Sequence, residues 1–190
     1  MNTPTFAIKP GAVALMVLMA ATRFHHFGTA TMLPDASLAV FFFAGLWLGG
    51  RYLFALLLLE AGLIDYLAIT QLGTSDFCIS NAYAFLIPSY AAMWLGGAWC
   101  RRFARLTVAS AAQQFVALVV STSAAFLISN GSFYWLSGRD ASTSWAHYVE
   151  SIALYFAPYL SATLIYGVVI FGLVSLFKSL QTTKTRHEAA

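Results

Sequence analysis

One of the two cysteines in this chain, Cys78, lies in a polar stretch that also contains Asp76, Ser80 and Asn81. A thiolate is a soft ligand, so a lone cysteine in polar surroundings favours binding of a metal or of a metal-bearing small molecule. The sequence leaves open a second interpretation, in which Cys78 is a small buried apolar side chain. The other cysteine, Cys100, follows the next apolar run, and we interpret it as a packing residue.

A disulfide between the two cysteines is excluded by the predicted layout. They stand at opposite ends of one predicted membrane span, whereas a disulfide needs Cα atoms about 4.4–6.8 Å apart. Cys78 is therefore expected to be a single thiol.

Four other ionisable residues have types that could do chemistry. His25 and His26 are adjacent, and adjacent residues on a helix do not face the same way, so they make a weak chelating pair and a polar interfacial pair is the alternative. Glu60 and Asp65 lie inside an apolar run, where ionisable groups are costly and usually functional. Their offset corresponds to about 140° on a helix, so they do not share a face. We expect Asp65 to reach an outer cavity. For Glu60 we favour a structural hydrogen-bonding role over a proton or ion site.

The elements that must position these residues are membrane-spanning helices. Of the 190 residues, 60% are hydrophobic and only 9% are charged, against about 25% in an average soluble protein. So few charges exclude an ordinary soluble enzyme, a disordered chain and a disulfide-stapled secreted module. The net charge of +3 arises from too few residues to predict a nucleic-acid-binding stripe.

Long apolar runs predict one all-α domain over residues 1–190 with six transmembrane helices. The predicted spans are residues 10–22, 35–48, 52–70, 81–99, 106–128 and 148–177. The first two are short for a bilayer, which favours local thinning, and Pro158 is expected to kink the sixth. Residues 1–21 also resemble a signal peptide, but we expect them to be retained and to contribute the first span.

Basic residues predict the orientation. Six spans would place eight of the ten on the side of the two termini and leave only Arg23 and Arg139 on the other side. The eight are Lys9, Arg51, Arg101, Arg102, Arg105, Lys178, Lys184 and Arg186. We therefore expect cytoplasmic termini, a location in the cell inner membrane, and outward connections at residues 23–34, 71–80 and 129–147. The third connection is expected to hold residues 133–135, three consecutive aromatics, in a loop.

With these features, the chain resembles the S components of energy-coupling factor (ECF) vitamin transporters, six-helix membrane proteins that bind a vitamin at the outer face. The stretch 76–83, taken with His25, His26 and Asp65, resembles the BtuM family, solitary S-component-like transporters of vitamin B12 (cobalamin). The resemblance implies an S-component-like bundle that binds cobalamin as its substrate. In that family the loop cysteine ligates the corrinoid cobalt, which implies that Cys78 is the axial ligand here.

The resemblance also suggests the surroundings of the substrate. We expect the cup and its polar edge to consist of Tyr83, Asn81, Tyr134, Trp135, Arg139, His26 and Asp65. A further hypothesis gives Cys78 a catalytic role, because thiolate donation to one axial position would weaken the opposite ligand and release cyanide from cyanocobalamin.

One feature departs from the ATP-energised relatives. Their first span carries an Ala-x-x-x-Ala patch for docking the coupling subunit, whereas here Ala12 is followed by Met16, and Ala14 by Leu18. This difference disfavours dependence on a shared ECF energising module.

The sequence leaves two other functional classes open. An S component for thiamin or biotin would make Cys78 incidental. An intramembrane enzyme is disfavoured, because a rhomboid-like protease needs a Gly-x-Ser-Gly turn in a helix, and the nearest string, Trp135 to Gly138, lacks the first glycine and is predicted to lie in a loop. A quinone-linked disulfide oxidase would need paired outward cysteines. A purely structural scaffold would not explain why chemistry-bearing residues gather in the outward connections.

Overall fold

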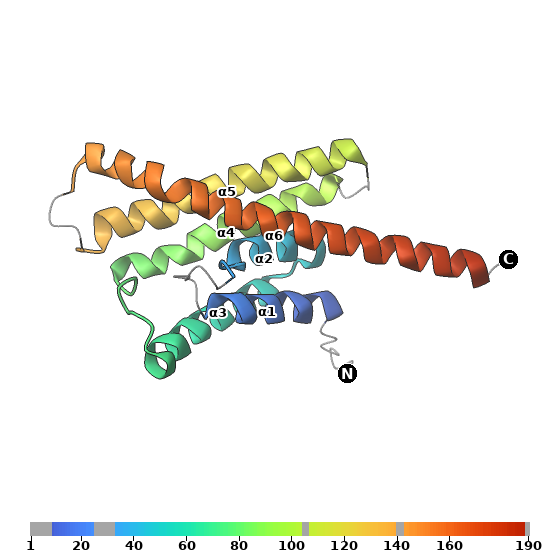
Figure 1. Cartoon of the computed structure of the whole chain (residues 1–190), viewed down its shortest axis with the longest axis horizontal. Helices are drawn as coiled ribbons and strands as arrows, with labels where there is room; N and C mark the ends of the chain where they lie inside the picture. Colours follow the sequence, from blue (N-terminus) through green and yellow to red (C-terminus); the bar gives the residue numbers. More distant parts are fainter. Residues whose placement is uncertain (1–8, 25–32, 104–106, 140–142, 189–190) are drawn as a thin grey trace, which may run out of the picture.

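A computed structural model describes residues 9–24, 33–103, 107–139 and 143–188, and all regular secondary structure in these ranges is helical (Figure 1). The predicted all-α class is therefore confirmed for the described part of the chain. The elements in order are α1 (Pro10–Arg23), α2 (Ser37–Phe43), the π-helical turn η1 (Ala44–Leu48), α3 (Arg51–Leu72), the 3-10 turn η2 (Asn81–Phe85), α4 (Leu86–Cys100), the 3-10 turn η3 (Arg101–Phe103), α5 (Val108–Leu136) and α6 (Trp145–Glu188).

Three of the described helices are long and apolar enough to cross a membrane. They are α3, α5 and the Trp145–Phe177 part of α6. Such lengths and compositions are those of a helical membrane protein. Helices α1 and α2 are short and apolar, as the sequence predicted, and α6 continues through Pro158 without interruption.

The prediction that residues 133–135 lie in a loop is wrong, because α5 continues to Leu136. Asn130 and Gly131 lie inside this helix, where a glycine costs only about 1 kcal/mol relative to alanine. Packing against α6 offsets that cost, since Tyr134 and Tyr148 have ring centroids 5.2 Å apart. The helix ends instead just before Gly138, whose φ of +68° suits glycine.

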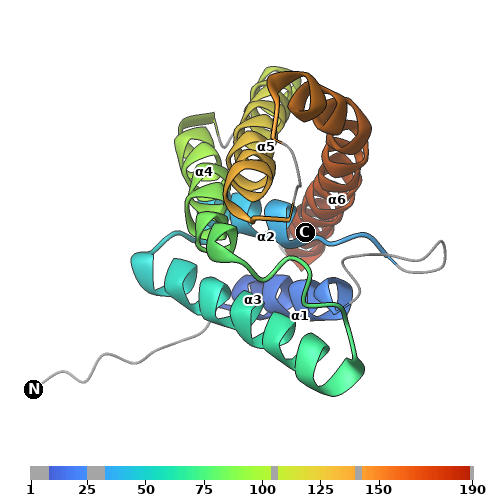
Figure 2. The same cartoon turned by 90° about the vertical axis from the view of Figure 1, so that its left-hand side faces the viewer.

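Helix α2 lies at the centre of the bundle. In Figure 2 it is flanked by α4, α5 and α6 on one side and by α1 and α3 on the other. All seven of its residues are buried, which is expected of a helix that is apolar on every face. Phe41 stacks on Tyr90 of α4, with ring centroids 4.2 Å apart, and meets Phe54 of α3 edge-on at 5.7 Å. Helix α2 therefore joins the two sides of the bundle.

Glycines allow α4 to approach this central helix closely. A Cβ atom added at Gly97 would collide with the backbone carbonyl of Phe42, and one added at Gly45 would collide with that of Trp94. Both obstacles are backbone atoms rather than flexible side chains, so the two helices would have to move apart.

We expect Gly97→Ala to lower the free energy of unfolding by about 3 kcal/mol, at the upper end of the range for overpacked cores. Gly62→Ala on α3 is the matched control, because a Cβ there meets nothing within 4 Å. Its better helix propensity should leave stability unchanged or raise it by up to about 1 kcal/mol. Unfolding of both variants in detergent checks this, and equal losses would contradict the close approach of α2 and α4.

The bundle has two distinct ends. The start of α1 and the end of α6 lie at one end, whereas the connection between α3 and η2, the end of α5 and the start of α6 lie at the opposite end (Figure 1). Chemistry-bearing residues from α3, residues 73–80 and η2 gather at this second end.

Candidate functional site

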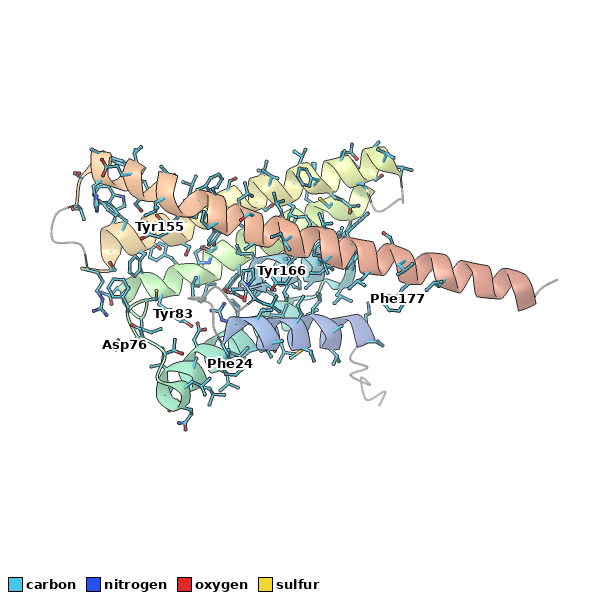
Figure 3. The ribbon with its side chains drawn as sticks, in the orientation of Figure 1. Phe24, Asp76, Tyr83, Tyr155, Tyr166 and Phe177 are labelled. Atoms are coloured by element: carbon cyan, nitrogen blue, oxygen red, sulfur yellow. The ribbon has the colours of Figure 1, made fainter. Side chains whose placement is uncertain are left out.

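Cys78 lines a small cavity at that second end of the bundle. The cavity has a volume of about 20 Å³, which is room for roughly one water molecule. Its lining residues are Asp65, Ala68, Ile69, Thr74, Ser75, Cys78, Ile79 and Tyr83. Figure 3 shows Tyr83 and Asp76 near this end, far from Phe177 on α6. The structure therefore brings together three of the residues that the sequence singled out: Cys78, Asp65 and Tyr83.

Two local caps hold the segment 73–80 that carries Cys78. At its start, Gly73 has a left-handed φ of +68° and the backbone N–H groups of Gly73 and Thr74 donate to the Ala68 carbonyl, which ends α3. At its other end, the Ser80 hydroxyl accepts a hydrogen bond from the Ala82 N–H at 3.3 Å and begins η2. Cys78 thus lies between two capped helix ends, which hold the backbone on both sides of it.

Asp65 forms the floor of the cavity and is held by a buried arginine. The Arg23 guanidinium donates to both carboxylate oxygens, through Nε to Oδ1 at 2.8 Å and through Nη2 to Oδ2 at 2.7 Å. Both residues are buried, at 3% and 4% exposure. This fork geometry is the strongest arrangement for pairing an arginine with a carboxylate.

Arg23 also connects several other elements. Its Nη1 donates to Asp35, two residues before α2, at 3.2 Å, to the hydroxyl of Ser37, the first residue of α2, at 3.0 Å, and to the Tyr90 hydroxyl on α4. The sequence assigned Arg23 to an outward connection, and that placement is wrong, because the residue ends α1 and is buried. A charge can be buried here because acceptors from α2, α3 and α4 converge on it.

Tyr83 links this ion cluster to the cavity. Its hydroxyl donates a hydrogen bond to Asp65 Oδ2 at 2.7 Å, the same oxygen that receives Arg23 Nη2. Any ligand group that enters the cavity therefore meets the polar side chains of Tyr83 and Asp65 as well as the thiol of Cys78.

Contacts of Phe77 link the Cys78 segment to Phe133 near the end of α5 and to Arg139, which follows that helix. The Phe77 ring lies 5.6 Å from the Phe133 ring, between centroids, and the Arg139 guanidinium lies 5.2 Å from the Phe77 centroid. These are weak contacts of a half-exposed side chain. They are the kind of contact that can open to enlarge the cavity.

The protonation of the thiol follows from its surroundings. Burial raises the pKa of Cys78, the Asp65 carboxylate raises it further, and the Arg139 guanidinium lowers it. At neutral pH the thiol is therefore mostly protonated, and a ligand that needs the thiolate must displace the proton on binding.

We expect the alkylation of Cys78 by iodoacetamide to accelerate with pH. The thiolate is the nucleophile, and below the pKa its fraction rises about tenfold per pH unit. Because the pKa is raised, the rate at pH 7.5 should be lower than that of a free cysteine. Arg139→Gln should slow the reaction further, since it removes the charge that lowers this pKa. Mass spectrometry measures the rates, and a wild-type rate above that of free cysteine would contradict the environment described.

The other predicted site residues lie elsewhere. Tyr134 is buried on α5, where its hydroxyl accepts from the Ser144 N–H and donates to the Ser144 carbonyl, both at 2.9 Å. Trp135 packs against Trp145, with ring centroids 5.1 Å apart. Asn81 is exposed at the start of η2. None of the three lines the cavity.

The two histidines of the predicted site, His25 and His26, lie outside the described residues. Within the described ranges, no group of three or more His, Cys, Asp or Glu side chains is arranged to hold a metal ion. The site there offers one soft ligand rather than a chelating set.

No family model matches the chain, and no curated protein matches it. The function proposed below therefore rests on the residues and geometry of the site.

Proposed function

We propose that this protein binds cobalamin and carries it across the cytoplasmic membrane, with Cys78 as axial ligand to the cobalt. The observation that carries the proposal is the cavity lined by Cys78, Asp65 and Tyr83, at one end of an apolar helical bundle. The proposal includes six membrane spans, cytoplasmic termini and membership of the BtuM family of solitary S-component-like transporters.

The ligand chemistry of the site favours a metal that brings its own ligands. The cavity offers a single thiol, that of Cys78, and the described residues form no group of three or more His, Cys, Asp or Glu side chains that could hold a metal ion. A corrin ring already occupies the four equatorial positions of its cobalt, so one protein ligand at an axial position completes the complex. A soft thiolate suits this position.

The cavity must open before a corrinoid can enter. Its volume of about 20 Å³ is far below the roughly 300–1,000 Å³ of ordinary ligand pockets. The contacts of Phe77 with Phe133 and Arg139 are the ones to break, because the caps at Gly73 and Ser80 belong to the adjoining helices. Because only open molecules can bind, the apparent affinity equals the affinity of the open form multiplied by the fraction of molecules that are open.

The distribution of basic residues supports the proposed orientation. Arg51 and Arg101 lie at the starts of α3 and η3, at the end of the bundle opposite the cavity (Figure 1). Positive charge is enriched on the cytoplasmic side of membrane proteins. With this orientation, the cavity faces outward and receives substrate from outside the cell. The missing Ala-x-x-x-Ala patch in α1 supports uptake without a shared ECF module.

Binding of three vitamins to the purified protein tests the proposal. By equilibrium dialysis, we expect cobalamin to bind and thiamin and biotin to remain free. Binding of thiamin or biotin instead, with no effect of Cys78→Ala, would favour the other class of S component and contradict cobalamin as substrate.

Release of cyanide tests the proposed reaction at Cys78. A cobalt–sulfur bond forms on one face of the corrin as the thiol loses its proton, and the opposite cobalt–carbon bond breaks. Cyanide leaves with the bonding electron pair and takes up the displaced proton, so cobalt keeps its oxidation state. We expect wild type to release cyanide from cyanocobalamin and Cys78→Ala to release none. Equal release from both proteins would contradict a role of the thiolate.

A further inference from the structure

Glu60 lies in the middle of the membrane-spanning helix α3. The helix runs from Arg51 to Leu72, and at about 1.5 Å per residue Glu60 stands roughly 14 Å from one end and roughly 18 Å from the other. This position puts its carboxyl group near mid-membrane depth, where ionisable side chains are rare and mark functional sites.

No described residue gives the Glu60 carboxyl a partner. Its Oε2 atom is buried without a hydrogen bond, so the structural hydrogen-bonding role favoured by the sequence is not supported. This absence distinguishes Glu60 from Asp65, five residues later on the same helix, which is held by Arg23.

The elements packed against α3 bring no opposite charge to Glu60. The only titratable or charged group of α1 is Arg23, which pairs with Asp65 and Asp35. Within the described residues, α2 and η1 carry none. On α4 the titratable groups are Tyr90, which accepts a hydrogen bond from Arg23, and Cys100, which is buried at the far end of the helix.

We propose that Glu60 is a proton-binding site in the membrane core, where it holds its proton at neutral pH. An isolated carboxylate in an apolar environment is strongly disfavoured relative to the neutral acid. A metal cation would need several oxygen ligands, and among the described residues no group of three or more His, Cys, Asp or Glu side chains could hold one. A proton is therefore the occupant that fits this position.

The two acids of helix α3 have opposite surroundings. Both carboxylate oxygens of Asp65 accept hydrogen bonds from Arg23, whereas the buried Oε2 atom of Glu60 has no hydrogen-bond partner. Helix α3 thus contributes Asp65 to the lining of the cavity. The same helix carries Glu60, whose charge depends on its exposure to water. The inference concerns the protein alone and does not depend on which substrate the cavity binds.

Labelling with dicyclohexylcarbodiimide tests this site in protein reconstituted into lipid vesicles. This apolar reagent reacts with protonated carboxyl groups. The acid proton moves to a carbodiimide nitrogen, the carboxylate oxygen adds to the central carbon, and the adduct rearranges to an N-acylurea without a leaving group. We expect peptide mass spectrometry to find the label on Glu60 and not on Asp65 at pH 7.

The pH dependence and two variants make the test specific. Above the pH at which Glu60 loses its proton, labelling should fall about tenfold per pH unit. Glu60→Gln should abolish labelling of this peptide. Glu150→Gln is the control, because Glu150 is exposed near the start of α6 and should leave Glu60 labelling unchanged.

Three results would overturn the proposal. They are an unlabelled Glu60 in wild-type protein at pH 7, labelling of Asp65 in its place, and protection of Glu60 by sodium chloride but not by choline chloride, which would indicate a cation site. All three results are measured on wild-type protein, so they test the proposal even if Glu60→Gln fails to fold.

Discussion

Replacing Arg23 by glutamine is expected to lower the free energy of unfolding by about 3–5 kcal/mol, the range for removing one partner of a buried ion pair. The loss is large because Arg23 is 3% exposed and holds two carboxylates. Without it, Asp65 is left buried with no guanidinium, and Asp35 loses its contact at 3.2 Å. Unfolding in detergent, followed by circular dichroism, measures the change.

Two further variants show whether the fork geometry matters. Arg23→Lys keeps the charge but cannot form both contacts to Asp65, so we expect an intermediate loss. Arg51→Gln is the matched control, because Arg51 is exposed and contacts the neighbouring Tyr52, and it should change stability by less than about 0.5 kcal/mol. If Arg23→Gln were as stable as Arg51→Gln, Arg23 would not be the structural centre of the site.

Replacing Cys78 by alanine is expected to weaken cobalamin binding by roughly 100-fold or more, equivalent to about 2.8 kcal/mol of binding free energy. The variant removes the only soft ligand in the cavity and leaves Asp65 and Tyr83 in place. Stability should change little, because Cys78 is only partly buried. Equilibrium dialysis with radiolabelled cobalamin measures the affinity.

The second cysteine of the chain provides the control for this substitution. Cys100 is fully buried near η3, at the opposite end of α4 from the cavity. Cys100→Ala should bind cobalamin as wild type does, although it should be less stable because it leaves a small void. Equal binding by the Cys78→Ala and Cys100→Ala variants would show that Cys78 is incidental.

The helical part of the fold could be predicted because its signals are local. Scarcity of charge and long apolar runs indicate membrane helices, and the predicted span 52–70 agrees closely with α3 at Arg51–Leu72. The end of α5 could not be predicted in this way. The polar residues Asn130 and Gly131 indicate a turn locally, and only contacts with α6, such as Gly131 beside the Tyr148 hydroxyl, decide that the helix continues.

The candidate site was predictable only in part. The sequence singled out Cys78, Asp65 and Tyr83, which share one cavity, but it missed Arg23 as the residue that holds Asp65. Its partners come from α2, α3 and α4, and no spacing along the chain encodes their meeting. One signal in the sequence could have predicted this pairing. An arginine at the end of a membrane span needs acceptors for its charge, and Asp35 and Asp65 are acids in the next two predicted spans.

The visible absorption spectrum of bound cobalamin tests the central claim most directly. Coordination of a thiolate to cobalt changes the electronic transitions of the corrin, so wild-type protein should shift the spectrum relative to free cobalamin. Any cobalamin that remains on Cys78→Ala should have the unshifted spectrum. A colourless wild-type protein that does not bind added cobalamin, or identical spectra for the two proteins, would contradict cobalt ligation by Cys78.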